Sequence, residues 1–60
     1  MYELSVAIMD YTTSSIRIFK RVFSVEIDVE TALIESGDFK PDTMNILWTK
    51  DNIDIIDERG

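Results

Sequence analysis

The strongest constraint on this chain is that it must build a small core without any covalent or metal cross-link. It has 60 residues and contains neither cysteine nor histidine. A chain of this length buries only about 60% of the surface that its unfolded form exposes, and its core supplies roughly 3–5 kcal/mol unaided. Disulfides and thiolate metal sites are excluded, and the commonest transition-metal ligand is missing. We therefore expect one small domain over residues 1–60, stabilised by a good core or by self-association.

The first part of the sequence predicts a β-hairpin. Residues 4–8 alternate large apolar with small side chains, as a strand with one buried face does. Residues 10–14 are polar turn formers. Residues 15–27 allow two interpretations: a strand with a bulge near residues 19–21, or a helix with an apolar stripe of Ile16, Phe19, Val22 and Phe23. The content of β-branched and aromatic residues favours the strand.

The middle of the sequence predicts a short helix over residues 28–37. Asp28 is a suitable N-cap, and Gly37 is the expected residue just after the last turn. Phe39 follows at once and can fold back onto the helix. Residues 40–43, with Pro41 in the second position, predict a turn.

Two further strands are expected after the turn, over residues 45–49 and 53–57, joined by residues 50–52. Ile53 and Ile55 then point to one face and Asp54 to the other, while Ile56 breaks the alternation. The predicted order is β-β-α-β-β. This is an α+β fold with a four-stranded antiparallel sheet and one helix on one face, so the other face of the sheet stays partly uncovered.

The charge is distributed unevenly around a net value of −6. Residues 1–25 hold two acids against three bases, a net of +1, whereas residues 26–60 hold ten acids against three bases, a net of −7. The acidic part either keeps the protein soluble or faces a basic protein partner. A field of this sign repels nucleic acid and anionic membranes. No stretch predicts a signal peptide or a membrane span, so we expect a cytoplasmic protein with no membrane partner.

The residues needed for most enzyme chemistry are missing. The hydroxyls of residues 12–15 have no histidine to activate them, and two glycines are too few for a phosphate-binding loop. Asp51, Asp54 and Asp57 recur every three residues, which on a strand puts Asp54 on the face opposite the other two. We expect no catalytic residue, no metal site, no cofactor and no enzymatic activity.

These observations favour a small acidic protein-binding module that self-associates through its sheet. The predicted interface comprises Trp48, Ile53, Asp54, Ile55, Ile56 and Asp57, with Trp48 either in the core or an anchor on the uncovered face. One alternative is an acidic inhibitor that occupies a cationic surface of a partner. In size and composition alone, the chain resembles accessory proteins of phage and other mobile elements, and no particular residue carries that resemblance. Another alternative is a weak nucleic-acid binder that uses Arg17, Lys20 and Arg21.

Overall fold

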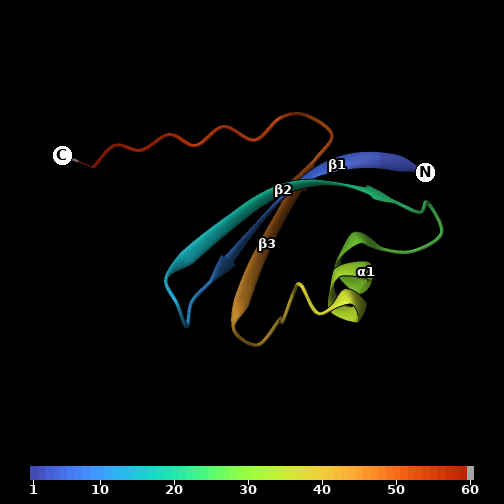
Figure 1. Ribbon diagram of the computed structural model, residues 1–60, viewed down its shortest axis with the longest axis horizontal. Helices are drawn as coiled ribbons and strands as arrows, with labels where there is room; N and C mark the ends of the chain where they lie inside the picture. The colour runs from blue at the N-terminus through green and yellow to red at the C-terminus, as the bar shows by residue number, and fades with distance from the viewer. Residues whose placement is uncertain (60) are drawn as a thin grey trace.

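The computed structural model describes residues 1–59 as a three-stranded antiparallel sheet and one helix (Figure 1). In chain order the elements are β1 (Tyr2–Asp10), β2 (Ser15–Phe23), α1 (Val29–Ser36) and β3 (Met44–Thr49). The sheet has the order β2-β1-β3, so β1 lies in the centre. The predicted α+β class, hairpin, helix and third strand are confirmed. The predicted fourth strand is wrong, and the observed order is β-β-α-β.

The hairpin of β1 and β2 is regular along its whole length. Its register runs unbroken from Tyr2 opposite Phe23 to Asp10 opposite Ser15. The predicted bulge near residues 19–21 is therefore wrong, and so is the helical alternative. The adjacent apolar residues Ile18 and Phe19 do not mark a change of phase. They lie on opposite faces of one continuous strand that is apolar on both sides.

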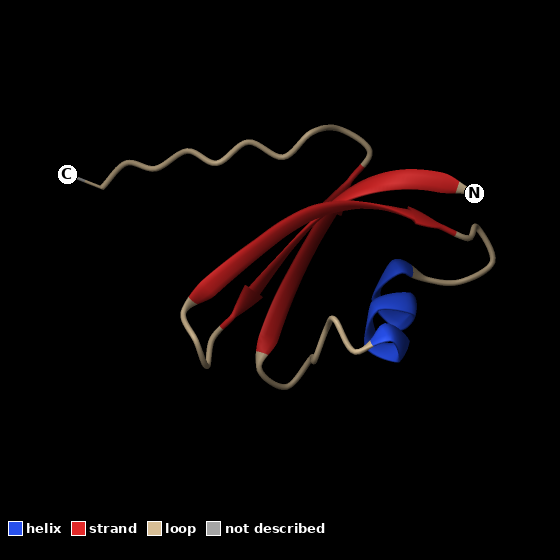
Figure 2. Cartoon of the chain, in the orientation of Figure 1, coloured by secondary structure: helices blue, strands red, loops and turns tan. Residues whose placement is uncertain are grey.

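The core lies between one face of the sheet and the helix (Figure 2). Every second residue of β1 points to this face, and Leu4, Val6 and Ile8 are buried. The helix contributes Val29 and Leu33, and Leu33 is completely buried. Phe23, at the end of β2, and Phe39, just after the helix, complete the buried cluster.

The helix ends as the sequence predicts, but its start is less well capped. Asp28 occupies the N-cap position with extended backbone, yet its side chain makes no capping hydrogen bond. Gly37 has a φ of 84°, a left-handed conformation that a residue with a Cβ rarely adopts. The N–H groups of Asp38 and Phe39 both donate to the carbonyl oxygen of Leu33, at 3.0 and 3.1 Å. These bonds direct Phe39 back into the core, as predicted.

Residues 51–59 form no helix or strand and leave the folded body as an open chain (Figure 1). The predicted strand over residues 53–57 would have to pair with the outer edge of β3, and two of the N–H groups at that edge already have partners. The N–H of Met44 donates to the carbonyl of Lys40 at 2.9 Å, and the N–H of Ile46 donates to the side-chain oxygen of Asn45 at 3.0 Å. These two bonds compete with pairing at the outer edge of β3, and residues 53–57 do not pair there.

Within the described residues, no helix has the length and apolar character needed to cross a membrane.

Candidate interaction surfaces

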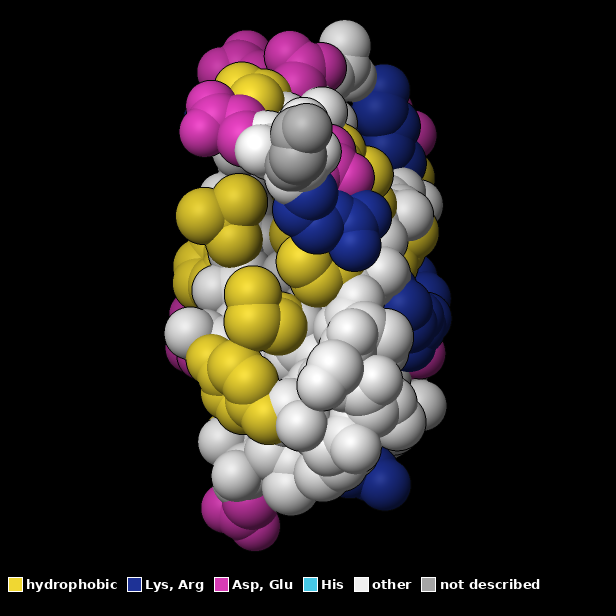
Figure 3. Space-filling model, turned by 90° about the vertical axis from the view of Figure 1, so that its left-hand side faces the viewer, with side chains coloured by type: hydrophobic (Ala, Val, Ile, Leu, Met, Phe, Trp, Pro, Cys, Tyr) yellow, Lys and Arg dark blue, Asp and Glu magenta, His cyan; other side chains and the backbone are white. Residues whose placement is uncertain are grey.

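The face of the sheet opposite the helix carries exposed apolar side chains. Residues that alternate with the core positions point to this open face, and five large ones are at least one-third exposed: Met9, Ile16, Ile18, Val22 and Leu47. A shallow hollow of about 220 Å³ lies among Ala7, Met9, Ile16 and Leu47. Seen from one end of the molecule, exposed hydrophobic side chains gather in a column along one side (Figure 3). Contiguous apolar surface of this kind is typical of sites where another protein docks.

The sheet has two outer edges, β3 and β2, and the edge of β2 is the free one in the sense that no backbone hydrogen bond is made to it among the described residues. The N–H of Tyr11 donates to the carbonyl of Thr43 at 2.9 Å, which continues the β1–β3 ladder. Because hydrogen-bonded positions alternate in antiparallel pairs, β1 uses its odd-numbered residues to bond β3 and its even-numbered residues to bond β2. The backbone groups of Ile16, Ile18, Lys20 and Val22 therefore point away from β1. No strand lies beside them within residues 1–59.

The helix-side face of β2 carries two arginines around one aromatic ring. The guanidinium groups of Arg17 and Arg21 lie 5.3 and 4.7 Å from the centre of the Phe19 ring, within cation–π range. Both arginines also reach Asp38, at 3.4 and 2.6 Å. One carboxylate thus serves two cations, so this surface keeps an excess of positive charge. Lys20 lies on the opposite face, so the three basic residues do not form one continuous patch.

Asp38 connects β2 to the end of the helix, and its protonation gives a testable pH dependence. The hydrogen bond from Arg21, followed by that from Ser36, lowers the pKa of Asp38 to about 2. In the unfolded chain this pKa is about 3.9. The folded state thus binds its proton less tightly, and the stabilisation is complete above about pH 4 and lost as the pH falls to about 2.

We expect Asp38→Asn to lower the melting temperature at pH 7 and to flatten its decline between about pH 4 and pH 2. Thermal melts followed by circular dichroism at several pH values measure both effects. The variant Asp42→Asn makes the same change of charge in the exposed turn and serves as the control. An Asp38→Asn protein that loses stability with acid as steeply as the native chain would contradict the assignment.

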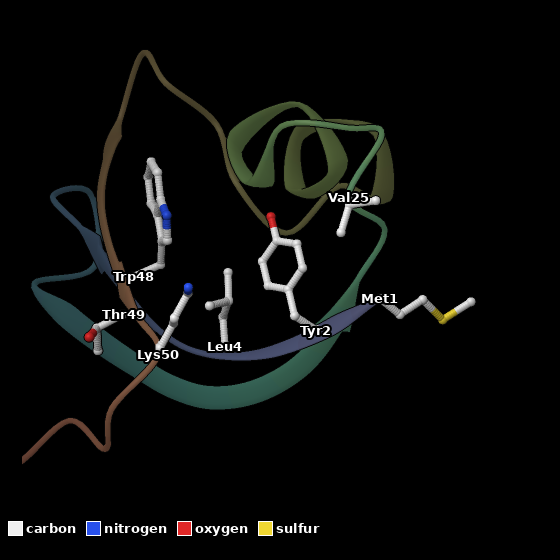
Figure 4. A pocket seen from close by; sticks show the side chains of 7 residues that line it. All are labelled: Met1, Tyr2, Leu4, Val25, Trp48, Thr49 and Lys50. Carbon is white, nitrogen blue, oxygen red and sulfur yellow. The ribbon is translucent and has the colours of Figure 1, made fainter.

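A second hollow opens on the helix side of the sheet, between the end of β3 and the segment that leads into α1 (Figure 4). It has a volume of about 620 Å³. Tyr2 and Trp48 face one another across it, and Leu4 forms its floor between them. The helix leaves this part of the sheet uncovered, so the side chain of Trp48 stays 41% exposed. The hollow suits an apolar side chain of a partner.

The residues predicted as an interface fall in two places. Trp48 lies on β3 on the helix side of the sheet, and not on the uncovered face. The others lie in the open chain after β3, where Ile55 and Ile56 are 77% and 80% exposed. Asp57 forms an ion pair with Arg59 at 2.9 Å, and this bond lowers the pKa of Asp57. The structure therefore does not bring Trp48 and residues 53–57 together into one surface.

Comparison with protein-family models gave no match, and searches of curated proteins and of solved structures gave none either. Among residues 1–59, no group of three or more carboxylates is arranged to hold a metal ion. The interpretation of function therefore depends on the surfaces described above. Sequence reasoning missed the free edge of β2 and the hollow beside Tyr2. The apolar character of both faces of β2 was the signal for the first.

Proposed function

We propose that this chain is a non-enzymatic protein-binding module that self-associates through its sheet. The observation that carries the proposal is the exposed apolar face of the sheet, bordered by the free edge of β2. Ile16 on this face is 59% exposed and Leu47 is 58% exposed. An unblocked edge next to an apolar face favours pairing with another chain. The small core supports the same conclusion, because association adds buried area that one copy lacks.

Sedimentation equilibrium over a range of protein concentrations tests this proposal. We expect the average mass to exceed that of a monomer once the protein concentration reaches about 100 μM. A dissociation constant of about 100 μM corresponds to a binding free energy of roughly −5.5 kcal/mol. Ile16→Lys should weaken association at least about tenfold, because a charge on the open face must then be desolvated.

Ile34→Lys is the matched control for that variant. It makes the same substitution on the exposed side of the helix, where Ile34 is 46% exposed, and it should leave association unchanged. A native protein that remains strictly monomeric at about 100 μM would refute the proposal. Equal effects of the two lysine variants would refute the role of the sheet.

A further inference from the structure

We infer that residues 53–58 of one copy add to the sheet of a second copy, as a strand parallel to β2 at its free edge. This inference rests on the proposed self-association and names the segment and the edge that make the contact. Three observations support it. The side chains of the two segments match in polarity and charge, the segment is too short to reach this edge in its own chain, and the alternative pairing of β2 with β2 brings like charges together.

Residues 53–58 complement residues 16–21 position by position. When the two segments are placed side by side in the same direction, apolar residues meet apolar residues and acids meet bases. The pairs are Ile53 with Ile16, Asp54 with Arg17, Ile55 with Ile18, Ile56 with Phe19, Asp57 with Lys20, and Glu58 with Arg21. Paired positions of neighbouring strands lie on the same face of a sheet, so both faces of the added strand match those of β2.

The charges of the two segments support the same pairing. Residues 16–21 carry three bases and no acid, and residues 53–58 carry three acids and no base. Asp54 and Glu58 would approach the two arginines that share the single carboxylate of Asp38. Opposite charges on adjacent strands contribute roughly 0.2–1 kcal/mol for each pair. The two best antiparallel registers are worse, because each matches only four of the six pairs. One places Asp57 opposite Ile18 and Ile55 opposite Lys20, and the other places Ile53 opposite Arg21 and Glu58 opposite Ile16.

The segment cannot reach this edge within its own chain. Thr49 lies level with Ser5 and hence with Lys20, and three strand spacings separate β3 from the position outside β2. That sideways distance is about 14 Å, and the return from the level of Lys20 to that of Ile16 is about 13 Å. The straight-line distance is therefore about 19 Å. The four peptide units from Thr49 to Ile53 span at most about 14 Å, so the strand must come from another copy.

Pairing of β2 with β2 of a second copy is the main competing arrangement. The antiparallel register that uses all nine residues of β2 places Arg17 opposite Arg21 twice. A parallel register without offset places each base opposite itself. Like charges directly opposite one another destabilise a sheet. Residues 53–58 avoid this repulsion.

Disulfide trapping between single-cysteine variants tests the arrangement, because the native chain has no cysteine. Neighbouring strands lie about 4.8 Å apart, within the Cα separation that a disulfide spans. One variant of each pair carries a size tag, and the mixed dimer is detected on a non-reducing gel. We expect Ile16→Cys mixed with Ile53→Cys to give the dominant mixed dimer. Val22→Cys with Ile53→Cys and Arg21→Cys with Ile53→Cys report the two antiparallel registers, and Ile16→Cys with Val22→Cys reports β2–β2 pairing.

A mixed dimer that is strongest for any of the other pairs would overturn the inference while leaving self-association in place. Absence of self-association in the native chain would instead refute the proposed function.

A charge exchange gives a second test that does not depend on the cysteines. Asp57→Lys should weaken association several-fold, and the double variant Lys20→Asp with Asp57→Lys should restore it. A double variant that associates as weakly as Asp57→Lys, or more weakly, would contradict the pairing of these two positions.

Discussion

Leu33→Ala should leave the protein largely unfolded at 25 °C. Leu33 is completely buried and belongs to the core cluster that joins the helix to the sheet. Replacing a buried leucine by alanine costs about 2–5 kcal/mol, and a core of this size supplies only roughly 3–5 kcal/mol in total. The two quantities are of the same size, so little or no stability remains. The far-ultraviolet circular dichroism spectrum and a urea titration of the dilute protein would show the loss.

Ile34→Ala is the matched control, because it removes the same number of carbon atoms from the next position of the same helix. Ile34 is 46% exposed, so this variant leaves no buried cavity and should shift the urea midpoint only slightly. Both variants place alanine in the same helix, so the helix propensity of the new residue is the same in the two proteins. Equal urea midpoints for the two variants would show that the helix does not depend on Leu33 for its packing.

The elements held by local signals could be predicted from the sequence. The alternation in residues 4–8, the polar turn after it and the left-handed Gly37 each specify structure within a few residues. The bulge near residues 19–21 could not be judged in the same way. Ile18 and Phe19 break the alternation, and only the pairing partner decides whether such a break is a bulge or a strand with two apolar faces. That information lies in β1 and not in β2.

The predicted strand over residues 53–57 failed for a related reason. Its pattern is that of a strand, but a strand forms only where an edge is available. The side chain of Asn45 and the carbonyl of Lys40 accept from two of the donors at the edge of β3, those of Ile46 and Met44, and neither contact follows from a hydrophobic pattern. The apolar residues 53, 55 and 56 stay candidates for an interface, and Ile55 and Ile56 are exposed. Their separation from Trp48 depends on the path of the chain after β3.

Closing the edge of β2 should weaken self-association strongly without unfolding the protein, and Ile18→Pro makes this change. The backbone N–H of Ile18 points away from β1, so proline removes no hydrogen bond of the hairpin. Proline is tolerated at such edge positions. Its ring, however, occupies the path of an incoming strand and removes one donor from the middle of the six paired positions. We expect association to weaken by at least about tenfold, since each factor of ten corresponds to about 1.4 kcal/mol.

Ile18→Thr separates the backbone effect from the side-chain effect. Threonine also removes apolar surface from the open face, but it keeps the N–H group and has a high preference for strands. If the added strand is held by the backbone of β2, Ile18→Thr should weaken association far less than Ile18→Pro. Sedimentation equilibrium measures both variants, and the circular dichroism melt of each checks that the domain stays folded. Equal losses in two folded variants would show that the apolar face, and not the edge, makes the contact.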